Sequence, residues 1–109
     1  VSSAASDVYK RQKYVSAYIN LAALILGQEE SIIIKMNNLG NSAADDRRYD
    51  ELRDKRNQLY LQAIPYLESA LEIDGSNFQA AKTLSNIFSA TGDDANAKKY
   101  KKLADSLNQ

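Results

Sequence analysis

The chain has 109 residues, enough for one small domain, and its fourteen basic and fourteen acidic side chains leave no net charge. This balance argues against a binding surface for nucleic acid or anionic lipid, because both attract strongly basic proteins. Cysteine and histidine are absent, which excludes disulfides, thiolate metal sites and the commonest general base of enzymes.

The first twelve residues, VSSAASDVYKRQ, do not begin with methionine. They resemble a translated sequencing-adapter read-through of the kind found at the edges of reading frames assembled from environmental DNA. We therefore expect residues 1–12 to be a non-native leader, with the natural protein beginning upstream. The alternative is a genuine leader that extends the first helix, with Ser6 and Asp7 at its N-cap.

Apolar residues recur three or four positions apart from Lys13 to Leu39, which predicts one long helix. The predicted stripe consists of Tyr14, Tyr18, Leu21, Ile25, Ile32, Met36 and Leu39. Gly27 is a weak point inside this helix, and Gly40 is expected to end it in the left-handed conformation. The uncharged stretch from Val15 to Gly27 is shorter than a bilayer span, so no membrane insertion is expected in this segment.

A second helix is expected to begin at Asp45 or Asp46, either of which suits the N-cap position. Its apolar stripe comprises Tyr49, Leu52, Leu59, Ala63, Leu67 and Ala70, and Arg56 interrupts it. Charges of both signs alternate from Asp45 to Arg56, which predicts a salt-bridged, solvent-exposed face rather than a phosphate site.

The third helix is expected to start near Ser76 or Asn77 and to end before Gly92, which supplies the next turn. A fourth helix should begin at Asp93 or Asp94. The buried face of the third helix is predicted to contain Ala81, Leu84, Ser85 and Phe88. That of the fourth is predicted to contain Ala97, Tyr100, Ala104 and Leu107.

Small residues recur at one fixed spacing in the second and fourth helices. The interval from Ala63 to Ala97 equals the interval from Ala70 to Ala104. Together with the turn at residues 74–77, this pattern resembles the tetratricopeptide repeat (TPR), a pair of antiparallel helices with a period of about 34 residues. The resemblance implies an all-α fold in which antiparallel hairpins stack as a right-handed solenoid fragment of four helices.

In the family pattern, small residues stand where helices cross closely and large ones fill the space between them. Ser85, Ala97 and Ala104 match the small positions here, and Leu84 and Phe88 match the large ones.

The resemblance divides the chain into an elongated TPR-like hairpin, residues 13–74, and an ordinary C-terminal hairpin, residues 75–109. The extra length of the first hairpin is expected to project beyond the stack, tipped by residues 40–45. Gly75 stands where the family usually has proline in the turn.

Four polar residues of the third helix share one face at helical spacing: Gln79, Lys82, Asn86 and Ser89. The resemblance implies that this face lines the partner-binding groove. Lys82 and Asn86 resemble part of the clamp that holds peptide carboxylates in some family members. The matching positions of the first helix are Ile19 and Ala23, which cannot hold a carboxylate, so a solvated polar face is the alternative.

A second candidate partner site is the apolar run around Ile33 and Ile34. Both residues fall outside the stripe of the first helix. Either they pack against the second helix or under a missing upstream repeat, or they form an exposed patch that marks a partner site.

The sequence contains no glycine-rich phosphate loop, nucleophile elbow or metal-ligand spacing, so no catalytic, cofactor or metal site is expected. The sequence and the resemblance together predict a non-catalytic interaction or scaffold module of bacterial type. It would be the C-terminal fragment of a longer protein and would bind a protein or peptide whose identity the sequence does not indicate. The alternatives are a structural helical domain that associates with a second copy, and a regulatory domain of a larger enzyme.

Overall fold

A computed structural model describes residues 3–108, with side chains from Lys10 onward. Five helical segments follow one another: α1 (Ser3–Leu26), α2 (Glu29–Asn37), α3 (Ala43–Ile73), α4 (Phe78–Thr91) and α5 (Asp94–Leu107). Residues 3–108 contain no strand, and the predicted all-α fold is confirmed. Within the expected leader, residues 3–12 form the first turns of α1, and residues 1 and 2 lie outside the described part.

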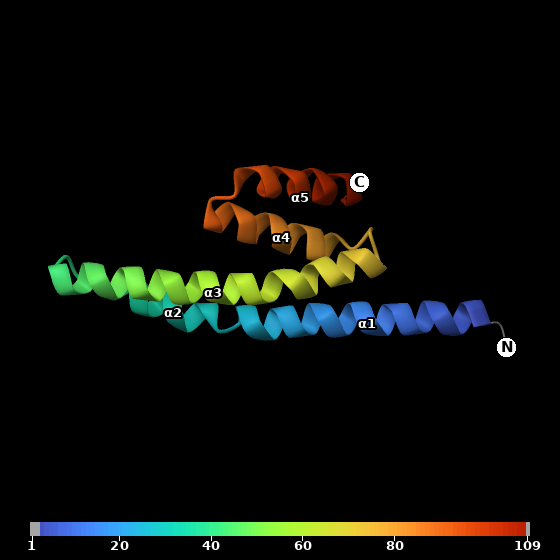
Figure 1. Cartoon of the computed structure of the whole chain (residues 1–109), viewed down its shortest axis with the longest axis horizontal. Coiled ribbons are helices and arrows are strands. Elements are labelled where there is room, and N and C mark those ends of the chain that lie inside the picture. The colour runs from blue at the N-terminus through green and yellow to red at the C-terminus, as the bar shows by residue number, and fades with distance from the viewer. Residues whose placement is uncertain (1–2, 109) are drawn as a thin grey trace.

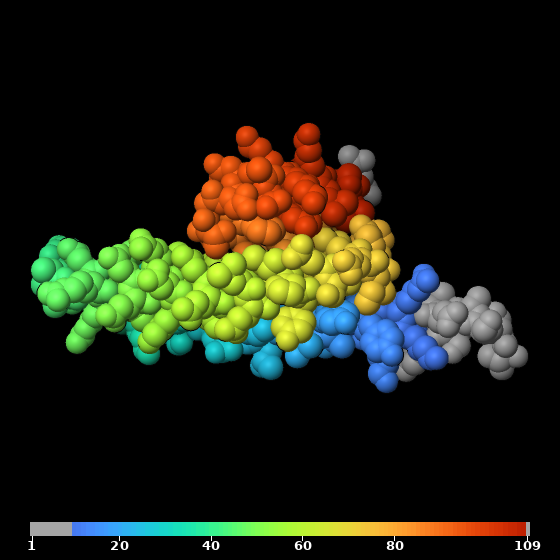
Figure 2. All heavy atoms as spheres, viewed as in Figure 1, coloured from blue at the N-terminus to red at the C-terminus, as the bar shows by residue number. Residues whose placement is uncertain are grey.

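The helices form an elongated, flat array in which α1, α3, α4 and α5 are consecutive antiparallel neighbours (Figure 1). The array measures 66 × 25 × 19 Å. Because α3 has 31 residues and α4 only 14, the N-terminal half of α3 and its neighbour α2 extend beyond the second hairpin (Figures 1 and 2). The tip of the first hairpin therefore projects beyond the second hairpin.

The first predicted helix is interrupted at Gly27 and Gln28 into α1 and α2. Counted as one broken helix, they leave the four helices that were expected. The Gly27 N–H still donates to the Ala23 carbonyl at 2.8 Å, but the Gln28 N–H turns to Ile25, three residues back, at 3.2 Å. A glycine inside a helix is less favourable than alanine by about 1 kcal/mol, which makes this the weakest point of the segment.

Two expectations about the tip of the hairpin were wrong. Gly40 is not left-handed, because α2 has already ended at Asn37. The Gly40 N–H instead donates to Oδ2 of Asp45 at 3.1 Å. The N-cap of α3 is Ser42, whose Oγ accepts a hydrogen bond from the Asp45 N–H at 3.1 Å. Asp45 and Asp46 lie in the first helical turn, where carboxylates complement the helix dipole.

The predicted ends of α4 and α5 are confirmed. Asn77 caps α4 by accepting from the Ala80 N–H at 2.9 Å. Asp93 caps α5 by accepting from the Asn96 N–H at 3.3 Å. Gly92, with φ of 84°, closes α4 in the left-handed conformation that side chains disfavour.

One buried cluster joins α1, α3, α4 and α5 through Val15, Ala22, Tyr60, Ala63, Leu67, Ala70, Ala80, Leu84, Ile87 and Tyr100. Four of these ten residues are alanines, whose small side chains let the helix backbones approach closely. The largest completely buried side chains are Leu67 and Leu84. At the crossing of α4 and α5, the Oγ of Ser85 donates to the Ala97 carbonyl at 3.2 Å, so these two predicted crossing positions meet.

The predicted apolar stripes were wrong about the burial of three aromatic or aliphatic residues. Tyr14, Leu21 and Tyr49 were expected in the core, but they are 56%, 42% and 44% exposed. On α1 the residues that face α3 are instead Val15 and Ala22. The helix is apolar on several sides, so periodicity alone does not indicate which side α3 covers.

By length and composition alone, the segment Lys10–Asn37 is apolar enough to cross a membrane. This differs from the expectation based on the shorter stretch from Val15 to Gly27. Buried core helices of soluble proteins and N-terminal signal sequences meet the same criterion, but only 6% of the apolar part of this segment is buried. In this fold, the turn at Gly27 and the carboxylates of Glu29 and Glu30 interrupt the segment.

Candidate functional site

The structure places the four predicted groove residues in one exposed row along α4. These residues are Gln79, Lys82, Asn86 and Ser89. The opposite side of α4 carries Ala80, Leu84 and Ile87, all buried. Because buried side chains fix the rotation of α4, the polar row points away from the core.

A small hollow of about 80 Å³ separates this helix from α1. Its walls include Gln79 and Thr83 on α4 and Ile19 and Ala23 on α1, and Leu67 of α3 also lines it. The hollow therefore lies between the first helices of the two hairpins. Thr83 was not predicted; its Oγ1 donates to the Gln79 carbonyl at 2.7 Å, so its hydroxyl proton is engaged within α4.

The hollow cannot act as a complete carboxylate clamp. Lys82 and Asn86 lie on the exposed row but do not line the hollow. Ile19 and Ala23, which occupy the matching positions of α1, give its wall an apolar character. The arrangement offers one ammonium group beside an apolar depression, which suits a peptide that presents an apolar side chain and a terminal carboxylate.

The two isoleucines of the second candidate site differ in their exposure to solvent. Ile33 is half-buried, and Ile34 is 52% exposed. Between them and the tip of the hairpin, Met36 is buried and anchors α2. Ile33 and Ile34 therefore do not form one open patch, and only Ile34 offers substantial apolar area to a partner.

A polar cluster that the sequence did not predict lies where α2 begins. The buried hydroxyl of Tyr60 donates to Oε1 of Glu29, and the Arg56 guanidinium lies 5.9 Å from the centre of the Tyr60 ring. Burial raises the pKa of Tyr60 to about 12; its hydrogen bond to Glu29 and the negative charge of that carboxylate add to the rise, and Arg56 opposes it.

Two buried polar atoms of α3 have no hydrogen-bond partner among the described residues: Nε of Arg56, which belongs to this cluster, and Oδ1 of Asn57, the next residue in the chain. The only signal in the sequence was Arg56 itself, which interrupts the apolar stripe of α3. Because Glu29 is the first residue of α2, its bond to Tyr60 ties the helix break to the middle of α3. The cluster therefore positions the projecting hairpin.

Replacing Tyr60 with phenylalanine should lower the free energy of unfolding by about 1–3 kcal/mol, because the half-buried Glu29 loses its donor. Since the folded-state pKa of Tyr60 is raised from 10.0 to about 12, its contribution is fully present below pH 10 and is lost as the pH rises through 12. Urea melts and an ultraviolet absorbance titration of tyrosinate check these expectations. Ionisation of Tyr60 near the ordinary tyrosine pKa of 10.0 would contradict them.

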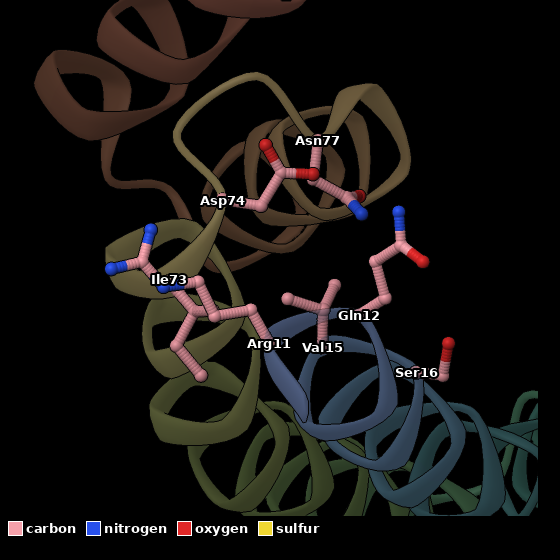
Figure 3. A pocket seen from close by; sticks show the side chains of 7 residues that line it. All are labelled: Arg11, Gln12, Val15, Ser16, Ile73, Asp74 and Asn77. Atoms are coloured by element: carbon pink, nitrogen blue, oxygen red, sulfur yellow. The ribbon is translucent and has the colours of Figure 1, made fainter. Parts of the chain in front are cut away.

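The hollow in Figure 3 lies between the N-terminal part of α1 and the turn before α4. Its lining comprises Arg11, Gln12, Val15, Ser16, Ile73, Asp74 and Asn77. Oδ1 of Asp74 already accepts from the N–H and Oγ of Ser76, at 3.1 and 2.8 Å, and Asn77 caps α4. Asp74 and Asn77 are therefore engaged in the turn, and Arg11, Gln12 and Ser16 supply the other polar side chains of the hollow.

The charged segment from Asp45 to Arg56 is largely exposed, as expected for a solvated face. Within the described residues it contains one ion pair, between Arg53 and Asp50 at 3.6 Å. An exposed pair of this kind contributes about 0–1 kcal/mol. Over the same residues, no group of three or more acidic side chains is arranged to hold a metal ion.

Comparisons with protein-family models, with curated proteins and with solved structures gave no match. Three features of this chain bear on its function: an exposed polar row on α4, an apolar hollow beside α1, and a projecting hairpin.

Proposed function

We propose that this chain is a non-catalytic protein–protein interaction or scaffold module built from two TPR-like hairpins. The first hairpin pairs α1 and α2 with α3, and the second pairs α4 with α5. The observation that carries the proposal is the exposed polar row of α4 beside the apolar hollow against α1.

Equivalent positions in the two hairpins support the repeat relationship. Ala70 of α3 and Ala104 of α5, which are equivalent under the repeat spacing, are 0% and 2% exposed. Ala63 is likewise completely buried, and its counterpart Ala97 accepts the hydrogen bond from Ser85. The same small residues thus occupy helix contacts in both hairpins, as a stacked repeat requires.

The proposed ligand is an extended peptide that lies along α4. An apolar side chain would enter the hollow lined by Ile19, Ala23 and Leu67, and a carboxylate would lie near Lys82. Because Lys82 is exposed and no cation occupies the matching position of α1, the charged contact contributes modestly. Most of the affinity would come from the apolar contact and from the rigidity of the helices that form the groove.

The test uses peptides selected from a random library with free C-termini, titrated into isotope-labelled protein and followed by NMR. Amide shifts should concentrate on α4 around Gln79 and Asn86 and on α1 around Ile19. Amidated versions of the same peptides should bind more weakly. Shifts confined to the tip of the hairpin would contradict the proposed groove.

Lys82→Ala should weaken peptide binding about fivefold, the effect of one modest charged contact. The free energy of unfolding should change by less than about 0.5 kcal/mol, because the side chain is exposed. Lys102→Ala, an exposed lysine of α5, is the matched control and should change neither quantity. A large loss of stability in Lys82→Ala would show that Lys82 is structural.

A further inference from the structure

An uncharged apolar row runs along the side of α1 that faces away from α3. Its members are Tyr14, Ala17, Leu21 and Leu24, all exposed, with Leu24 at 73%. Their spacing of three, four and three positions places them on one face of the helix. Exposed apolar rows of this kind mark contact surfaces.

The second hairpin shows what covers such a row. When α1 is aligned on α4, the three positions Ala17, Leu21 and Leu24 coincide with Ala80, Leu84 and Ile87. Two of the three residues are identical and the third exchanges leucine for isoleucine. The row of α4 is buried, at 0%, 0% and 3% exposed, in the cluster that it shares with α3. A helix with the chemistry of α3 therefore fits a row of this composition.

The α5 end of a second copy of this chain cannot supply that helix. In α3, Leu67 is part of the buried cluster, and Ile64 and Leu71 pack against it. Aligning α3 on α5 by the repeat spacing replaces these three by charged, exposed residues, namely Lys98, Lys101 and Asp105. Stacking the α5 face of one copy on the α1 row of another would bury charges against apolar side chains, which is strongly unfavourable.

The size of the row argues for a tethered occupant. It spans about ten residues, or roughly 15 Å of helix. A stable complex between free partners buries about 800 Å² on each side, far more than one short row offers. A helix on the same polypeptide is held at high effective concentration, so a small contact suffices.

We propose that the outward row of α1 is the seat for the second helix of a further hairpin of this type, one with apolar residues where α3 has Ile64, Leu67 and Leu71. Further hairpins would then add to the array on its α1 side, whereas the charged face of α5 does not suit an apolar row of this kind. This inference rests on the repeat architecture of the proposed function but does not involve the peptide groove.

A tandem protein tests the proposal. A second copy of residues 13–77 is joined directly to the N-terminal side of Val15. The turn at residues 74–77, which joins α3 to α4 in the original chain, then joins the added copy of α3 to the original α1. The tandem protein should unfold in one transition, with a midpoint at least about 5 °C above that of the original chain. The amide protons of Leu21 and Leu24 should exchange at least about tenfold more slowly in the tandem protein.

The matched control carries Leu21→Lys and Leu24→Lys together. In the original chain both positions are exposed, so the double variant should unfold like the unsubstituted protein. In the tandem protein it should remove the gain in midpoint and the slowed exchange. Two separate transitions in the unsubstituted tandem protein, with unchanged exchange at Leu21 and Leu24, would overturn the proposal.

Two other occupants have distinct signatures in the original chain. Sedimentation as a dimer that the double lysine variant converts to monomer would identify a second copy as the occupant. Co-sedimentation with phosphatidylcholine vesicles, abolished by the same variant, would identify a membrane. Either result would overturn the proposal, and neither would affect the test of the groove at Lys82.

Discussion

Replacing Leu84 with alanine is expected to lower the free energy of unfolding by about 2–5 kcal/mol, the range for large-to-small changes in a packed core. Leu84 is completely buried and belongs to the cluster that joins α4 to α3 and α5. Its truncation removes apolar contacts and leaves a cavity that alanine neighbours cannot fill. Urea melts followed by circular dichroism measure the change.

Leu61→Ala is the matched control for this substitution. Leu61 lies in α3, is 64% exposed and has the same side chain, so its truncation should change the free energy of unfolding by less than about 1 kcal/mol. If Leu84→Ala has an equally small effect, α4 does not pack on α3 as described.

Enlarging Ala63 to leucine is expected to lower the free energy of unfolding by about 1–3 kcal/mol, because extra methylenes in a filled core force neighbouring atoms apart. Ala63 is completely buried in the cluster that also contains Ala22 of α1 and Ala80 of α4. Close approach of these helices leaves no room for a larger side chain. Thermal and urea melts check the change.

Ala90→Leu, at an exposed position of α4, controls for the effect of leucine itself on helix stability. It should be close to neutral, since leucine is nearly as good a helix former as alanine. A neutral or stabilising Ala63→Leu would contradict the close crossing and indicate a looser arrangement of the hairpins.

The ends of α4 and α5 were predictable because their causes are local. Asn77 and Asp93 each cap the helix that follows them, and Gly92 adopts the left-handed conformation for which glycine is preferred. At the tip of the first hairpin several residues compete for the same role. Ser42 took the N-cap position that Asp45 was expected to fill, and that choice depends on where α2 ends.

The orientation of α1 was not predictable from periodicity. Tyr14 and Leu21 recur at the same spacing as the buried Val15 and Ala22, so either row satisfies a helical pattern. The choice between them depends on α3, whose small Ala63 sits in the same buried cluster as Ala22. Tertiary packing therefore decides which of the two rows is buried.

One part of the candidate site was predictable from the sequence, and the other parts were not. The exposed row of Lys82 and its neighbours follows from helical spacing alone and was predicted. The bond between Tyr60 and Glu29 joins residues 31 positions apart and depends on the break at Gly27, so no local pattern reveals it. The same holds for the place of Thr83 beside the hollow, because α1 forms the opposite wall.

Small-angle X-ray scattering of the whole chain tests the stacked, projecting arrangement most directly. The structure has a radius of gyration of 17.1 Å and a longest dimension of 66 Å. A compact domain of this length would have a radius of gyration of about 13 Å. A monomer whose measured value lies close to 17.1 Å supports hairpins that stack in one direction with α2 and α3 projecting. A measured value of about 13 Å would mean that the first hairpin folds back on the second, contradicting this arrangement.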